Sequence, residues 1–180
     1  GVICGLPLIG LLFEIKKSQG ISVEYQCGDG DCVEADQVVA ELSGPTIELL
    51  EVERTMLNFL QRLSGTATVA RAFVEASGGK LKICDTRKTT PLWRDLEKYA
   101  VLMGGGSNHR MGLYDMVMIK DTHADAAGGL AQAIESVRPH KGSVPIAVET
   151  RNIEEVQLAL DNRVDLIMLD NMSLDVMRQA

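Results

Sequence analysis

Two adjacent cations in the middle of the chain are of the residue types that bind small anions. Arg87 and Lys88 come directly after a short apolar run and the pair Asp85-Thr86. An arginine binds a carboxylate or phosphate through its planar fork, and a lysine binds as a point charge. This pattern favours an anion-binding loop, and a solvent-exposed basic pair is the alternative.

A glycine-rich segment delivers a second pair of polar side chains. Residues 104–106 are three glycines, and Ser107-Asn108-His109-Arg110 follow them. A helix is expected before the glycines, over residues 92–103, so we predict that they end it rather than form a dinucleotide-binding loop. A neutral His109 beside Arg110 can donate a hydrogen bond to a ligand.

Lys120, Glu149 and Asp170 each follow a further apolar run directly. A lysine at the end of a buried strand requires an anionic partner, which is a ligand anion, Glu149 or Asp170. Two carboxylates at one rim suit Mg²⁺ with a phosphorylated substrate, through oxygen ligands and retained waters. An internal network of Lys120 with the two carboxylates, without a metal, is the alternative.

The elements that must position these residues alternate after residue 79. Apolar runs predict strands at residues 81–84, 116–119, 146–148 and 166–169, with helices between them, clearest over residues 126–137 and 153–160. Alternating strands and helices indicate parallel pairing, so polar residues at the carboxyl ends of the strands gather on one face. A closed barrel needs about eight such units. We therefore expect a longer protein whose last barrel strands lie outside this chain.

The first third predicts a small mixed domain. Pro7 and the apolar residues that follow at helical spacing indicate a helix. Strands are expected over residues 21–26 and 33–42, joined across a turn at residues 28–31.

A helical pattern over residues 46–63 is expected to break at Ser64-Gly65, with a second helix over residues 66–76. We therefore predict one domain at residues 1–65 and a second at residues 66–180.

Positive charge is concentrated in the middle of the chain. The net charge of −7 divides into −8 for residues 1–53, +6 for residues 54–120 and −5 for residues 121–180. An acidic chain with a basic middle is not typical of nucleic-acid binding and suits a small anionic ligand, with a solvated basic face as the alternative. No apolar run is long enough to span a bilayer. The four cysteines contain no CxxC motif, so we expect reduced thiols rather than a zinc site.

Several of these motifs occur together and in order. They are ERTMLN at 53–58, LSGTAT at 63–68, DTRKTTP at 85–91, EKYAV at 97–101, GGGSNHR at 104–110, IKD at 119–121, VE at 148–149 and LDN at 169–171. Over essentially the whole chain, this set resembles the quinolinate phosphoribosyltransferases, the carboxylating nicotinate-nucleotide pyrophosphorylases of de novo NAD synthesis. The resemblance implies an α/β fold, with an N-terminal sheet-and-helix domain followed by a type II phosphoribosyltransferase α/β barrel, incomplete at both ends in this chain.

The resemblance also implies an activity. Such an enzyme transfers the 5-phosphoribosyl group of PRPP to the nitrogen of quinolinate, with release of pyrophosphate and CO₂, and leaves nicotinate mononucleotide. The implied substrate-binding residues are Arg54, Thr86, Arg87, Lys88, His109, Arg110 and Lys120. The implied catalytic residues are Lys88, Lys120, Glu149 and Asp170, of which Glu149 and Asp170 would hold Mg²⁺.

The resemblance implies a homodimer with a shared active site, because the family's counterpart of Arg54 comes from a neighbouring subunit. Three positions depart from the family pattern, with Leu92 in place of a glycine, Thr122 in place of an asparagine and Ala147 where a glutamate is frequent. We also expect the family's Ser-Gly-Gly phosphate loop to follow Ala180.

Two other functions stay open at this point. One is a related phosphoribosyltransferase that acts on another pyridine carboxylate, and the other is a non-catalytic anion-binding fragment. We expect a cytoplasmic protein, with an organellar origin also open, and neither nucleic acid nor membrane as a partner.

Overall fold

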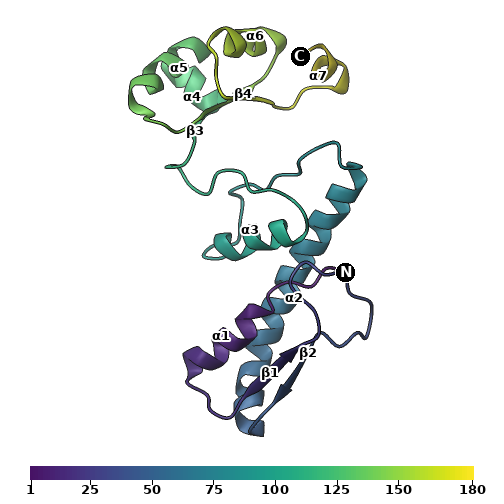
Figure 1. Ribbon diagram of the computed structural model, residues 1–180. Helices are drawn as coiled ribbons and strands as arrows, with labels where there is room; N and C mark the ends of the chain where they lie inside the picture. Colours follow the sequence, from purple (N-terminus) through teal and green to yellow (C-terminus); the bar gives the residue numbers. More distant parts are fainter. The chain divides into compact units, whose positions relative to one another are not determined.

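The computed structural model describes residues 1–180, and the chain divides into two compact units, residues 1–109 and residues 110–180. The first unit contains α1 (Pro7–Lys16), β1 (Ser22–Tyr25), β2 (Ala40–Ser43), α2 (Thr46–Ala76) and α3 (Arg94–Met103). The second contains β3 (Val117–Ile119), α4 (Asp121–Ala127), α5 (Leu130–Val137), a 3-10 turn (Arg138–His140), β4 (Ile146–Thr150), α6 (Ile153–Asp161), β5 (Leu166–Leu169) and α7 (Leu174–Gln179). Figure 1 labels these elements except β5 and the 3-10 turn.

Helix α1 begins at the proline, as predicted. Pro7 lies in the first turn, where its missing N–H is not needed, and the buried residues Ile9 and Phe13 follow one helical turn apart. Strands β1 and β2 pair antiparallel. Ile9, Phe13 and Val52 form a core cluster that also takes in apolar residues of both strands. Helix α1, the two strands and the first part of α2 therefore pack together around this cluster.

Helix α2 is continuous through Gly65, so the predicted break at this residue is wrong. A glycine within a helix costs about 1 kcal/mol relative to alanine. Packing on both sides of Gly65 outweighs this cost, because Leu63 and Ala67 are fully buried in a cluster shared with α3. Ser64 Oγ also accepts a hydrogen bond from Cys4 N at 2.9 Å. The domain boundary at residue 65 falls inside this helix and stays a prediction.

The strand predicted over residues 33–42 is confirmed only at its end, because β2 begins at Ala40. The preceding segment pairs with the start of the chain instead. Val33 N donates to Gly1 O at 2.8 Å, and Cys32 forms an isolated bridge with Val2.

The strand predicted over residues 81–84 is reduced to one bridge. Cys84 pairs in parallel with Ser107, and no regular ladder extends from this pair. The glycines before Ser107 end helix α3, as predicted, with Gly104 at the C-cap.

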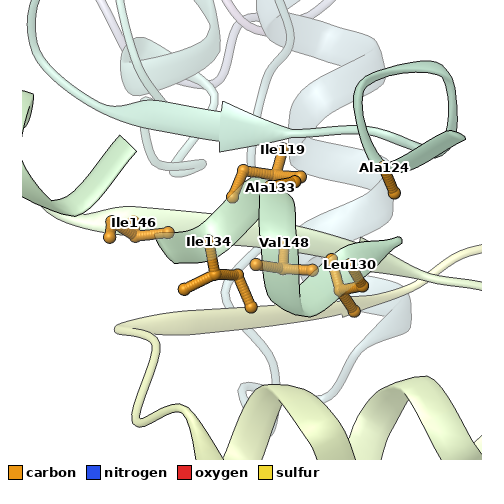
Figure 2. Close-up of a cluster of buried hydrophobic side chains, with 7 residues drawn as sticks. All are labelled: Ile119, Ala124, Leu130, Ala133, Ile134, Ile146 and Val148. Atoms are coloured by element: carbon orange, nitrogen blue, oxygen red, sulfur yellow. The ribbon is translucent and has the colours of Figure 1, made fainter. Parts of the chain in front are cut away.

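The second unit contains a parallel sheet in the order β3-β4-β5, which confirms the predicted strands over residues 116–119, 146–148 and 166–169. Ile134 of α5 packs on Ile146 and Val148 of the central strand, and all three side chains are almost completely buried (Figure 2). The helix predicted over residues 126–137 is broken into α4 and α5, because Gly128 and Gly129 adopt positive φ angles of 86° and 142°. The α/β class is therefore confirmed.

No helix in the chain combines the length and the apolar character needed to cross a membrane.

Candidate active site

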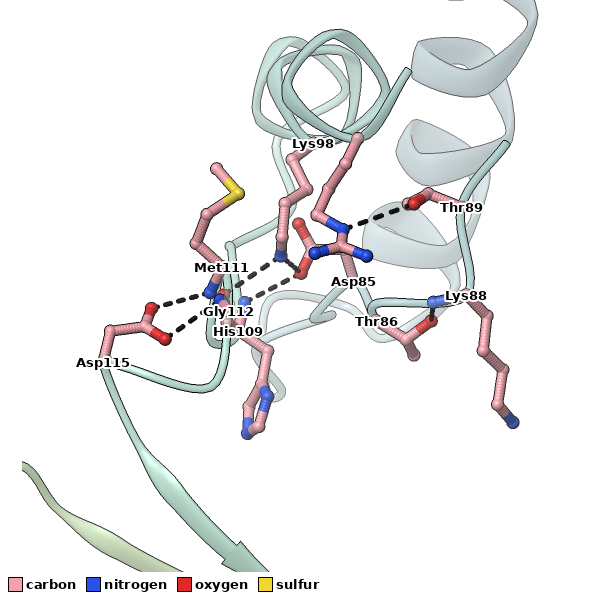
Figure 3. Close-up of polar contacts among 10 residues, drawn as sticks. Asp85, Thr86, Lys88, Thr89, Lys98, His109, Met111, Gly112 and Asp115 are labelled. Carbon is pink, nitrogen blue, oxygen red and sulfur yellow. Dashed lines mark hydrogen bonds and ion pairs between the residues drawn. The ribbon is translucent and has the colours of Figure 1, made fainter. Parts of the chain in front are cut away.

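The anion-binding loop predicted at Arg87 and Lys88 follows the isolated bridge between Cys84 and Ser107. Asp85, directly before this loop, is almost fully buried and forms an ion pair with Lys98 of α3, whose side chain is 1% exposed. Lys98 Nζ also donates to His109 O at 3.0 Å, and His109 N donates to Asp85 Oδ1 at 2.9 Å (Figure 3). The loop and the histidine are therefore joined by one buried polar cluster.

Two side-chain donors in this region have no partner. Arg87 Nε and His109 Nε2 are both buried from solvent and accept or donate no hydrogen bond. Buried polar atoms are nearly always hydrogen-bonded, because leaving one unpaired costs about 1–3 kcal/mol. The guanidinium and a protonated Nε2 are both donors, so an anion is the partner that would satisfy them.

Thr86 and Lys88 are exposed and flank Arg87 in the loop. Thr86 Oγ1 accepts from Lys88 N at 3.0 Å, which closes a local turn and leaves the Lys88 ammonium extended away from Asp85 (Figure 3). Both residues line a cavity of about 280 Å³ together with Asp85 and Lys98. The cavity wall therefore carries both a free cation and the buried pair.

The far end of the loop is fixed by Glu97. Its carboxylate accepts from Thr90 N at 3.0 Å and from Thr90 Oγ1 at 2.7 Å, and Arg62 Nη2 lies 3.6 Å from it. Burial alone would raise the pKa of Glu97, but the Thr90 hydrogen bonds and the Arg62 charge outweigh it and hold that pKa below its ordinary value. The carboxylate is therefore ionised at neutral pH.

A larger cavity of about 910 Å³ adjoins the same loop in the first unit. Asn58, Arg62 and Thr66 of α2 line one side, and Asp85 and Trp93 contribute to the rest of the wall. The Trp93 ring is held in place by stacking on Phe59, with ring centroids 4.9 Å apart. The space beside the loop is thus wide enough for a small aromatic ligand and has an aromatic wall.

Arg54 lies on α2, more than two turns before Thr66. Its side chain is exposed, it lines neither cavity, and it makes no hydrogen bond or ion pair. The structure therefore does not bring Arg54 to Arg87 and His109 within one chain.

The second unit carries the other predicted residues at the carboxyl end of its sheet. Ile119 and Val148 are paired in register, so Lys120 and Glu149 follow at the same level, and Lys120 Nζ donates to Glu149 Oε1 at 3.1 Å. Asp170 follows the neighbouring strand β5 and accepts from the Asn171 amide at 2.9 Å. The structure therefore brings Lys120 and Glu149 into contact, and Asp170 follows the strand beside them at the same end of the sheet.

Arg110 is at the start of the second unit. Its Nη1 atom donates to Met116 O at 3.2 Å, and its Nη2 atom lies 3.3 Å from the Met118 sulfur. The guanidinium is therefore held against the beginning of β3.

The residues at the sheet edge fit Mg²⁺ in donor chemistry. Glu149 and Asp170 offer carboxylate oxygens, and Mg²⁺ is usually bound by one or two carboxylates together with substrate phosphates and water. No further His, Cys, Asp or Glu joins them in a cluster of three. A substrate and water would therefore complete the coordination.

The sequence patterns did not predict the contact between Lys98 and Asp85. In the sequence, Asp85 stands as a neighbour of the basic pair and Lys98 as part of a motif. A signal was present, because Lys98 lies in helix α3 directly before the apolar segment 99–103, where a buried face is expected. A lysine on such a face requires a buried anion.

Family models match both parts of the chain. The model for the N-terminal domain of quinolinate phosphoribosyl transferase matches residues 1–64, and the model for its C-terminal domain matches residues 66–180. Together these models cover nearly the whole chain.

Curated relatives carry corresponding names. A probable nicotinate-nucleotide pyrophosphorylase [carboxylating] of Synechocystis is 45% identical over 184 residues and matches 100% of this chain and 61% of its own length. A chloroplastic nicotinate-nucleotide pyrophosphorylase [carboxylating] of Arabidopsis thaliana is 41% identical, with 96% of this chain and 52% of its own length covered. The chain thus spans only half to three fifths of the length of these two relatives.

Solved structures agree in fold. The crystal structure of NadC from Streptococcus pyogenes has a TM-score of 0.95 and 41% identity, over 99% of this chain and 64% of that one. A nicotinate-nucleotide pyrophosphorylase from Ehrlichia chaffeensis has a TM-score of 0.93 and 40% identity, over 99% of this chain and 65% of that one.

Proposed function

This chain belongs to the quinolinate phosphoribosyltransferase family, and from that premise we propose that the protein transfers the 5-phosphoribosyl group of PRPP to quinolinate. The bond between ribose C1 and pyrophosphate breaks, and a bond from C1 to the pyridine nitrogen forms. The ring then loses one carboxylate as CO₂ and takes up a proton at that carbon, which gives nicotinate mononucleotide. The names of the curated relatives, carboxylating or decarboxylating according to the direction, support this assignment.

The observation that carries the proposal is the pair of buried, unpartnered donors at Arg87 Nε and His109 Nε2. Quinolinate is a dianion with two adjacent carboxylates, and it would supply the missing acceptors. Thr86 and Lys88 would bind from exposed positions of the same loop, and Arg110 and Lys120 would add positive charge. Binding both carboxylates would hold the pyridine ring in one orientation, which is the main way such a site lowers a barrier.

Glu149 and Asp170 would supply negative charge to the reaction. Positive charge develops at ribose C1 as pyrophosphate leaves, and fixed carboxylates stabilise such charge. We propose that these two residues also hold Mg²⁺, which would neutralise the phosphates of PRPP when bound. Lys120, held by Glu149, would be kept from free rotation and directed by that contact.

We further propose a homodimer in which Arg54 serves the active site of the neighbouring subunit. Support comes from its exposed position on α2 without any partner in its own chain. A cytoplasmic location is supported by the four cysteines, all of them free, since free thiols are typical of reducing compartments. Several plant relatives are named as chloroplastic or mitochondrial, so an organelle is the alternative location.

The test is a calorimetric titration of the full-length protein with quinolinate, with nicotinate as the paired control. Nicotinate lacks the second carboxylate, so quinolinate should bind at least about tenfold more tightly if both donors are used. The Arg87→Lys variant keeps the charge but loses the fork, and it should lose most of this preference. Equal binding of the two acids would indicate a transferase for another pyridine. Binding of either acid without product formation from PRPP would indicate a non-catalytic anion-binding protein.

A further inference from the structure

We propose that Lys98 and Asp85 are positioning residues, which fix the backbone of His109 and thereby direct its ring to the substrate. This inference rests on the proposed function for its consequence in catalysis. Its structural part stands on the contacts of the buried pair alone.

The side chains of Asp85 and Lys98 take the place of two backbone hydrogen bonds that would continue a parallel ladder. Ser107 N donates to Ile83 O at 2.8 Å, and Asp85 N donates to Ser107 O at 3.1 Å. In a regular parallel ladder, the next bonds would run from His109 N to Asp85 O and from Arg87 N to His109 O. Here His109 N donates to the Asp85 carboxylate instead, and His109 O accepts from Lys98 Nζ.

This replacement separates the loop that contains Arg87 from the segment that contains His109. Because side chains satisfy both backbone groups of His109, the segment that begins at Thr86 does not need to pair with it. The loop with Arg87 is therefore free to turn away while the histidine stays fixed. Figure 3 shows the His109 ring directed away from the Asp85–Lys98 pair, so its unpartnered Nε2 atom is left for a ligand.

Stability of the fold alone does not explain the buried ion pair of Lys98 and Asp85. Lys98 is 1% exposed and the Asp85 side chain is 6% exposed, and removing such charges from water has a large cost. Apolar residues of similar volume often serve a folded core equally well. What apolar residues cannot do is accept from His109 N and donate to His109 O. The Asn108 amide, with its nitrogen toward Asp85, satisfies the second carboxylate oxygen at 2.6 Å.

Lys98 belongs to a polar stripe on one face of helix α3. Arg94, Glu97 and Lys98 are spaced i, i+3 and i+4, so they lie on the same face. Arg94 Nε contacts Thr89 Oγ1 at 3.5 Å, and Glu97 holds Thr90. One helix face therefore contacts residues 85, 89 and 90 around the loop, and Lys98 also reaches His109.

The experiment uses the full-length enzyme and the Lys98→Met variant, with Val52→Ala as the matched control. Val52 is buried in a separate core cluster, so its truncation lowers stability without touching the pair. If Lys98 positions His109, the KM for quinolinate should rise about tenfold or more while the KM for PRPP changes less than about twofold. The control should leave both KM values unchanged.

A readout that does not depend on turnover accompanies the kinetics. The 180 residues contain three histidines, His109, His123 and His140. In the full-length protein with labelled histidine, the His109 ring signal is assigned by NMR as the one that His109→Gln removes. Lys98→Met should shift the His109 signal and leave those of His123 and His140 in place, whereas Val52→Ala should shift none of the three. An unshifted His109 signal in Lys98→Met overturns the inference.

A second variant guards against loss of folding. Lys98→Met combined with Asp85→Asn removes both charges together, so no uncompensated charge is left buried. It should show the same split between the two KM values, with a smaller loss of stability. Equal changes in both KM values, or a lower kcat with both KM values unchanged, overturn the positioning role. If the wild-type enzyme makes no nicotinate mononucleotide, the proposed function fails, and the histidine spectra still decide the structural part.

Discussion

Lys120 and Glu149 stand at the same level of two neighbouring parallel strands, with Nζ and Oε1 3.1 Å apart. The lysine side chain is 43% exposed and that of the glutamate 16%, so the pair lies at the edge of the sheet and not in its core. A partly exposed ion pair adds about 0–1 kcal/mol to stability. Its place at the carboxyl end of the sheet is therefore better explained by a ligand than by folding.

The first prediction concerns Glu149. Glu149→Gln should lower kcat by about a hundredfold to a thousandfold, because it removes one fixed negative charge where positive charge develops. The free energy of unfolding should change by less than about 1 kcal/mol. Steady-state kinetics and urea unfolding of the full-length protein measure the two effects. Glu154→Gln, an exposed glutamate at the start of α6, is the matched control and should leave both unchanged. Full activity of Glu149→Gln would remove this residue from the proposed mechanism.

The second prediction concerns the pH dependence of the loop contact at Glu97. Its pKa is lowered in the folded state, so its stabilising contribution is complete above the ordinary value of 4.5 and is lost as pH falls through the lower folded pKa. Glu97→Gln should therefore be less stable than the wild type at pH 7. The difference between their unfolding temperatures should shrink as the pH falls below about 4.5.

The comparison with Glu97→Gln is needed because other carboxylates titrate in the same range. Hydrogen bonds from Arg151 also lower the pKa of Glu155, for example, although burial opposes this. Such groups affect wild type and variant equally and cancel in the difference. A difference that stays constant as the pH is lowered well below 4.5 would contradict the ionised Glu97 contact.

The parallel sheet could be predicted from the sequence because its signals are local. Each strand of the second unit is a short apolar run, and the polar residue after it, such as Lys120 or Glu149, marks the carboxyl end. The pairing order then followed from the chain order, since β3, β4 and β5 are neighbours in that order. The edge that gathers these side chains was therefore predictable.

The first unit was less predictable because its decisive contacts are distant in sequence. Gly65 signals a helix end locally, but the burial of Leu63 and Ala67 against α3 keeps the helix intact. The role of Lys98 depends on Asp85, thirteen residues away, and on a loop whose course no periodic pattern reveals. Local propensity fails at both points because tertiary packing outweighs it.

The third prediction uses one substitution at two glycines. A Cβ atom at Gly104 would lie 2.4 Å from Ala67 O and 2.6 Å from the Ala70 Cβ atom, so the close approach of α3 to α2 requires a glycine there. Gly104→Ala should lower the free energy of unfolding by about 1–3 kcal/mol.

Gly65→Ala is the matched control, since nothing lies within 4 Å of its added Cβ atom. It should raise stability by about 0.5–1 kcal/mol, because it replaces a glycine within a helix. Urea unfolding measures both, and a shift of the same sign in the two variants would contradict the packing argument.

The last prediction concerns Leu92, which stands where the resembling family has a glycine. Its φ angle of 68° is in the left-handed region, and its side chain is fully exposed, so no packing compensates the strain. That conformation costs about 1–2 kcal/mol for a residue with a Cβ atom. A glycine adds about 0.5–1 kcal/mol of chain entropy to the unfolded state, which is the smaller effect. Leu92→Gly should therefore raise the free energy of unfolding, by up to about 1 kcal/mol.

Leu113 is the matched control, because it is also an exposed loop leucine but its φ angle is not positive. Leu113→Gly should lower stability by the entropy effect alone. Equal losses in the two variants would mean that Leu92 is not strained.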